Sequence, residues 1–269
     1  MNKQNRKKIE EVKKPTMIGS FHGKDANKLA LKRFAAMFVI LLVYFVTAFL
    51  FSFDILWIRV ICSFVVVAMV CLFTYSQGAS QGESDAGYGE IMYARQQEGK
   101  QISKEEHDRC FHPLKGFYAV VLGTLPFVLI AIYFACKTTL TSYTLGGLPS
   151  WTSSLLEQNE TGDALAYYSA NQQGMQFFDY LRIFVRGLIM PFVNVAVSIG
   201  REAVLSVERL SPVFLLIAPM GYAVGYTQGI KMRIRVNTSI KLGVEKKKRR
   251  EKRERKQRQR NSRQPEQLI

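Results

Sequence analysis

Long apolar runs separated by polar stretches dominate the pattern of this chain. Residues 34–53 carry no charged side chain, and residues 55–75 carry only Arg59. An α-helix needs about 20 apolar residues to cross a hydrocarbon core about 30 Å thick, so each run is long enough to span a bilayer. Because a single residue separates the two runs, we expect residues 34–75 to form a transmembrane hairpin.

Two further runs, residues 116–136 and 210–230, also lack charged side chains over a spanning length. Pro126 in the former is tolerated in a transmembrane helix, since neighbouring helices satisfy the freed backbone groups. Residues 76–115 then connect the second and third spans, and residues 137–209 connect the third and fourth. The sequence therefore predicts an all-α polytopic membrane protein with four transmembrane helices.

Residues 181–200 are apolar but contain Arg182, Arg186 and Asn194. The uncharged stretch from Gly187 to Gly200 has only about 14 residues, fewer than a full crossing needs. We therefore expect an interfacial or re-entrant helix here, with the two arginines one turn apart against headgroups or a polar groove. The alternative is a fifth span, which would place the two ends of the chain on opposite sides of the membrane.

Positive charge gathers at the two ends of the chain. Residues 1–33 hold ten Lys or Arg against three acids, a net charge of +7, and residues 231–269 hold sixteen against four, a net charge of +12. The whole chain carries +16, which leaves −3 for residues 34–230. Basic segments beside transmembrane helices stay on the cytoplasmic side. We therefore expect an even number of crossings, both termini and residues 76–115 in the cytoplasm, residues 137–209 outside, and, in a bacterium, the plasma membrane as the location.

The segment 231–269 is almost free of apolar residues after Val244, and its densest basic run comprises Lys246, Lys247, Lys248, Arg249, Arg250, Lys252 and Arg253. Glu245 precedes Arg249 by four residues, a spacing that supports a solvated helix by about 0.2 to 0.5 kcal/mol. We expect a solvated helix or a disordered tail. Anionic headgroups attract basic residues by about 1 kcal/mol each near the surface, so lipid is the first expected partner. Non-specific contact with RNA or the ribosome is the alternative.

Three glycines, Gly221, Gly225 and Gly229, recur at intervals of four residues in the fourth apolar run. Glycines at this spacing share one helix face and let another backbone approach closely. We expect them to pack against a helix of the same chain, or else to form an interface with a protein partner or a second copy of the chain.

One cluster of residues has metal-ligand chemistry: His107, Cys110 and His112. Their spacing matches no structural zinc pattern, so they are weak candidates. Ser103 and Glu106, just before them, fit a helix capping box. We therefore interpret the cluster as part of a structural loop that positions the third span.

Motifs of catalysis are absent from the sequence. It contains no His-Glu-x-x-His, no Gly-x-Ser-x-Gly and no phosphate-binding glycine loop, and we predict no cofactor. No acidic residue lies near the middle of a predicted span, which argues against proton-coupled transport. Lys115 is expected at the bilayer edge.

These features favour a non-enzymatic scaffold or accessory subunit of a membrane complex, attached to anionic lipid by its basic tail. The second hypothesis is a component of a transporter, channel or insertase, with Arg182, Arg186 and Asn194 in a groove formed by residues 181–200 and the fourth span. Tail-mediated recruitment of RNA or the ribosome is the third.

Overall fold

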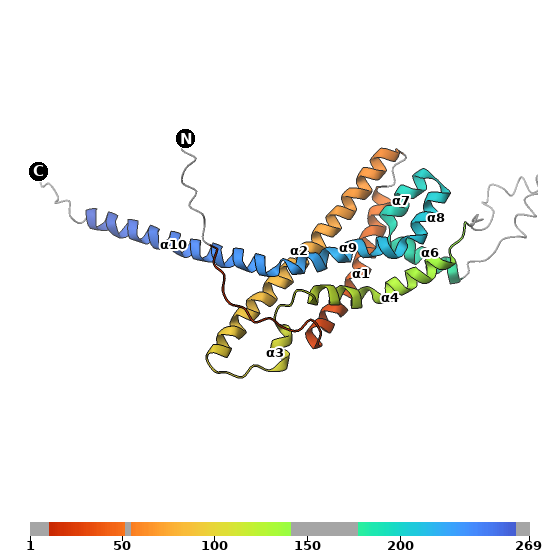
Figure 1. Cartoon of the computed structure of the whole chain (residues 1–269). Helices are drawn as coiled ribbons and strands as arrows, with labels where there is room; N and C mark the ends of the chain where they lie inside the picture. Colours follow the sequence, from red (N-terminus) through yellow and green to blue (C-terminus); the bar gives the residue numbers. More distant parts are fainter. Residues whose placement is uncertain (1–10, 52–54, 141–176, 262–269) are drawn as a thin grey trace, which may run out of the picture. The chain divides into compact units, whose positions relative to one another are not determined.

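The computed structural model describes residues 11–51, 55–140 and 177–261, and within these ranges the chain contains helices and no strand. Part of the predicted outer region, residues 141–176, lies outside them. The helices labelled in Figure 1 are α1 (Lys24–Leu50), α2 (Leu56–Gln97), α3 (Lys104–Arg109), α4 (Lys115–Lys137), α6 (Phe177–Leu188), α7 (Met190–Ile199), α8 (Arg201–Arg209), α9 (Ser211–Thr227) and α10 (Gly229–Asn261). The prediction of an all-α fold is confirmed.

Several of these helices suit a membrane. α1, α2 and α4 are each long and apolar enough to cross one. Two bent pairs add further candidates: α6 and α7 meet at 101°, and α8 and α9 meet at 61°. The described helices thus provide three spans, or up to five if each bent pair crosses as one broken span. This agrees with the membrane class expected from the apolar runs.

α2 is much longer than the apolar run that predicted it. The run ends at Tyr75, whereas the helix continues through polar residues to Gln97. It stops where Gly99 adopts a φ of 77° and donates its N–H to the Gln96 carbonyl at 3.0 Å, a left-handed ending that glycine favours. The connection expected at residues 76–115 is therefore helical throughout its first half.

The basic segment at the end of the chain is helical as well. α10 runs without a break from Gly229 to Asn261, which corresponds to the helical alternative for the tail. Residues 239–259 are exposed along its whole length. The basic side chains of this stretch are therefore presented in every direction around the helix.

The described residues divide into two compact units. The first draws on Met1–Arg33, Cys71–Gly123 and Met220–Ile269, and the second on Phe34–Val70 and Thr124–Pro219. The chain passes from one unit to the other inside α1, α2, α4 and α9, whereas α6, α7 and α8 belong wholly to the second unit. Both described ends of the chain therefore belong to the first unit.

Within the first unit, α9 and the start of α10 lie backbone to backbone against α2. A Cβ atom on each predicted packing glycine would meet the α2 backbone at less than normal contact distance; the pairs are Gly221 with Cys71, Gly225 with Tyr75 and Gly229 with Gly82. The partners rise in step along both helices, so α9 runs parallel to α2, in the same direction. All three glycines thus contact a helix of their own chain.

Candidate functional site

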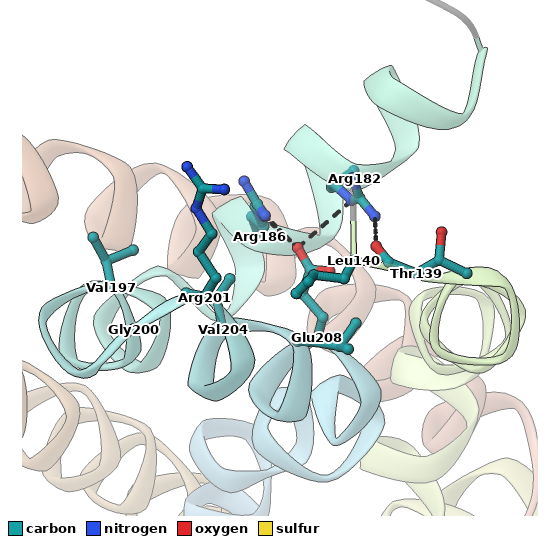
Figure 2. A pocket seen from close by; sticks show the side chains of 10 residues that line it. Thr139, Leu140, Arg182, Arg186, Val197, Gly200, Arg201, Val204 and Glu208 are labelled. Carbon is teal, nitrogen blue, oxygen red and sulfur yellow. Dashed lines mark hydrogen bonds and ion pairs between the residues drawn. The ribbon is translucent and has the colours of Figure 1, made fainter. Parts of the chain in front are cut away.

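The second unit contains a cavity of about 320 Å³ with a charged wall (Figure 2). Its charged lining residues are Arg182, Arg186, Arg201 and Glu208, and we call it the arginine cavity. The remaining lining is largely aliphatic and includes Leu140, Val197, Val204 and Leu205. The side chains come from α6, the end of α7, α8 and the two residues 139–140 that follow α4.

Glu208 is the centre of the charged group. Its side chain is only 2% exposed, and its carboxylate accepts hydrogen bonds from Arg186 Nε and from the Thr138 hydroxyl, each at 2.6 Å. Arg182 Nε lies 3.6 Å from the same carboxylate. A buried carboxylate is costly unless it is paired and hydrogen-bonded, and these three partners satisfy that need.

Arg182 is held in place from several sides. It donates to the Thr138 hydroxyl at 2.9 Å and to the Thr139 carbonyl at 3.1 Å. Its guanidinium also lies 5.6 Å from the ring centre of Phe178, within cation–π range. Arg186, one turn further along α6, is about one-third exposed and faces Glu208 from the cavity side (Figure 2).

Arg201 completes the set from the start of α8. Its side chain is exposed, and within the described ranges it forms no hydrogen bond or ion pair. Gly200, which precedes it, also lines the cavity and has a φ of 147°, and no side chain in the described part of the chain caps the N-terminus of α8. With three arginines against one glutamate, the cavity has a formal charge of +2.

The groove expected from Arg182, Arg186 and Asn194 is only partly assembled. The two arginines line the arginine cavity, but Asn194 lines a separate cavity of about 10 Å³ together with Tyr44. Sequence reasoning also missed Glu208. Its signal was present: Glu202 and Glu208 are the only acids among residues 181–209, where four arginines need counter-charge.

The first unit holds a buried charge network around Lys115. This side chain is fully buried, and its Nζ lies 2.6 Å from Asp25 and 3.3 Å from Asp85. Nζ also donates to the Asp108 carbonyl at 2.9 Å, and the Tyr226 hydroxyl donates to Asp85 at 2.6 Å. One lysine therefore joins α1, α2, α4 and the end of α3, while Asp85 links that group to α9.

The weak metal candidates do not converge. Within the described part of the chain, no group of three potential ligands is placed to hold a metal ion. The Cys110 thiol donates to the Glu106 carbonyl at 3.4 Å, and His112 Nδ1 accepts the Leu114 N–H at 3.2 Å. Burial raises the pKa of Cys110 to about 11, so the thiol stays protonated at neutral pH. His107 is exposed.

The N-terminal part of the basic helix α10 is hydrogen-bonded to α2. Arg233 donates to Glu83 at 2.9 Å and to Glu90 at 3.0 Å, and the Asn237 amide donates to Glu90 at 2.7 Å. The N-terminal segment adds a bond from the Val12 N–H to the Thr238 hydroxyl at 3.1 Å. Lys246 through Arg253 lie beyond this attachment and are exposed.

No family model, curated protein or solved structure matches this chain. Three features of the molecule itself indicate function: the arginine cavity of the second unit, the buried lysine network of the first, and the exposed basic helix.

Proposed function

We propose that this protein is a non-enzymatic membrane scaffold with four crossings, both described ends in the cytoplasm, and a basic helix that tethers RNA or the ribosome to the membrane. The observation that carries the proposal is the parallel packing of α9 and α10 on α2. This packing supports an even number of crossings and a direction of α10 away from the membrane.

Parallel packing supports an even number of crossings. α2 is the second apolar helix of the chain, so a helix that crosses in the same direction must be an even-numbered span. α9 would be the fourth if α6 and α7 do not cross, and the fifth if they do.

The shape of the α6–α7 pair also favours a re-entrant or interfacial element. α6 has 12 residues and α7 has 10, so neither is longer than about 18 Å at 1.5 Å per residue. Their bend of 101° prevents them from running as one straight helix. A hydrocarbon core about 30 Å thick is therefore more than either helix can cross.

The register between α10 and α2 supports a basic run that extends away from the bilayer. Asn237 contacts Glu90, so Val244 lies level with Gln97, about 33 Å along the helix from the apolar end at Tyr75. If the helix is tilted by 40° from the membrane normal, Val244 is still about 25 Å from the level of Tyr75 along that normal. Since screening acts over about 8 Å in physiological salt, this distance supports a basic run that binds a partner other than the headgroups of its own membrane.

The charge of α10 suits a polyanion that surrounds it. Basic side chains point in all directions between residues 239 and 259, whereas a flat lipid surface would contact one side only. RNA phosphates are contacted by Lys and Arg without sequence readout, and affinity then falls steeply with salt. The absence of aromatic residues in this stretch fits binding without base stacking.

The test uses the full-length protein in nanodiscs, with and without anionic lipid, and a fluorescent structured RNA titrated across a range of salt. Replacing Lys246, Lys247, Lys248 and Arg249 by Gln should weaken binding at least tenfold and lower the salt slope by about 3. The matched variant replaces Lys3, Arg6, Lys7 and Lys8 by Gln and should change affinity less than threefold. Equal losses in both variants, or no RNA binding, would contradict the proposal.

A photoreactive amino acid at Gln257 separates RNA from lipid in the same preparation. We expect cross-links to RNA, or to ribosomes added in its place, and none to phospholipid. Cross-linking to phospholipid that depends on anionic headgroups would instead establish the lipid attachment expected from sequence alone.

A second candidate function, a component of a transporter, channel or insertase, is favoured by the arginine cavity alone. Anion flux in vesicles that is lost on replacing Arg186 would support it, and vesicles without flux would remove it.

A further inference from the structure

The arginine cavity has more positive charge than its own residues neutralise. Among the described residues, Glu208 is the one carboxylate in its lining, against Arg182, Arg186 and Arg201. In the described ranges, Arg201 forms no ion pair, and Arg186 meets Glu208 through Nε and one terminal nitrogen. A guanidinium has five N–H donors, so both arginines keep donors for another partner.

The start of α8 adds to this bias. Gly200 lines the cavity and immediately precedes the first turn of α8, where no side chain caps the backbone N–H groups. Such N–H groups and the helix dipole both favour a negative charge. Two arginines with free donors and an uncapped helix start thus meet at one cavity.

The size and the rest of the lining narrow the chemical class of ligand. A cavity of about 320 Å³ is at the small end of ligand sites. A carboxylate has two oxygens, whereas a phosphate group offers more acceptors and matches guanidinium forks on several sides. Leu140, Val197, Val204 and Leu205 leave aliphatic surface for a carbon portion next to the anion.

We propose that the arginine cavity binds a phosphate group, supplied either by a phospholipid headgroup or by a small soluble phosphate compound. Arg186, Arg201 and the uncapped start of α8 bind the phosphate oxygens. Glu208 positions Arg186 and Arg182 and does not touch the ligand. This proposal is independent of the role of α10, because the cavity lies wholly in the second unit.

The experiment uses the full-length protein with Arg201→Gln and, as its matched control, Arg209→Gln at the other end of α8. Arg209 is exposed and does not line the cavity. Calorimetric titration with inorganic phosphate tests the soluble source. Native mass spectrometry of protein purified in mild detergent tests the lipid source, by the mass of any retained phospholipid.

Saturable binding of inorganic phosphate that weakens at least tenfold in Arg201→Gln, but not in Arg209→Gln, supports a soluble phosphate ligand. A retained phospholipid that is lost in Arg201→Gln alone supports a headgroup ligand. Arg186→Lys, which keeps the charge and removes the fork, should weaken whichever ligand binds. If neither ligand binds, or if both α8 variants behave alike while thermal melting shows them folded, the proposal is wrong.

Discussion

Arg233 on α10 and Glu90 on α2 form a two-point contact: Nε and one terminal nitrogen of the guanidinium both donate to the same carboxylate oxygen at 3.0 Å. The residues lie far apart in sequence, yet this contact extends the close helix packing that begins at Gly221 and Cys71. The contact lies one helix turn after Gly229, where the row of packing glycines ends and the basic helix α10 begins. The direction of α10 therefore depends on α2.

Replacing Arg233 by Gln should weaken the packing of the N-terminal part of α10 against α2. Hydrogen bonds to charged groups contribute about 1.5 to 3 kcal/mol each when buried, and this side chain is one-quarter exposed, so we expect a loss of about 1 to 2 kcal/mol. Tryptic cleavage within α10 should become faster. Arg235→Gln removes an exposed arginine two residues away and should leave the cleavage rate unchanged; equal acceleration in both variants would contradict the role of the contact.

Gly225→Ala should destabilise the first unit. The added Cβ would collide with the backbone of Tyr75, and overpacking of this kind costs about 1 to 3 kcal/mol. Gly243 offers the opposite case, because nothing lies within 4 Å of a Cβ there. Gly243→Ala should stabilise α10 by up to about 1 kcal/mol. Thermal melting in detergent compares the two, and an unchanged melting temperature for Gly225→Ala would show that α9 does not pack this closely on α2.

Glu208→Gln should destabilise the second unit strongly. It removes the negative charge that Arg182 and Arg186 face, and breaking a buried ion pair costs about 3 to 5 kcal/mol. Glu202, an exposed acid two residues after Gly200, provides the comparison: Glu202→Gln should fall within about 0.5 kcal/mol of the parent protein. Chemical denaturation followed by fluorescence measures both. Similar midpoints for the two variants would mean that Glu208 is not buried between arginines.

Acid should loosen α3 before the rest of the first unit. The Ser103 backbone N–H and hydroxyl both donate to the Glu106 carboxylate and lower its pKa below the ordinary value. The capping box therefore contributes its full stability above the unfolded carboxyl pKa of about 4.3, and loses it as pH falls through the lower, folded value. Hydrogen exchange of residues 103–110 should rise over that window relative to an unfolded peptide. In Glu106→Gln this pH dependence should disappear; its persistence would assign the effect to another group.

Sequence patterns located the apolar helices well, because hydropathy depends on each residue's own side chain. The runs at residues 34–53, 55–75 and 116–136 each lie largely within α1, α2 and α4. The end of α2 was not predictable in the same way. Its polar extension is stabilised by Arg233 and Asn237, and no local pattern reports a partner so distant in the chain.

In the candidate site, too, the local features were predictable from the sequence and the tertiary contacts were not. Arg182 and Arg186 share one face of α6 because they are four residues apart, and that much followed from spacing. Asn194 was expected beside them, but the bend of 101° between α6 and α7 directs it to another cavity. Glu208 and the burial of Lys115 depend on tertiary contacts across several helices, which a single sequence does not reveal.

α9 and α10 run parallel to α2, and a single distance between α10 and α2 tests this arrangement. Nitroxide labels at Gln96 and Gly243 in the membrane-reconstituted protein should lie within about 25 Å of each other by pulsed electron paramagnetic resonance, since packed helix axes are about 8 to 10 Å apart. If α9 were a fifth span, these two positions would lie on opposite sides of the bilayer. A separation beyond about 40 Å, more than the hydrocarbon thickness, would show that α9 and α10 do not run parallel to α2.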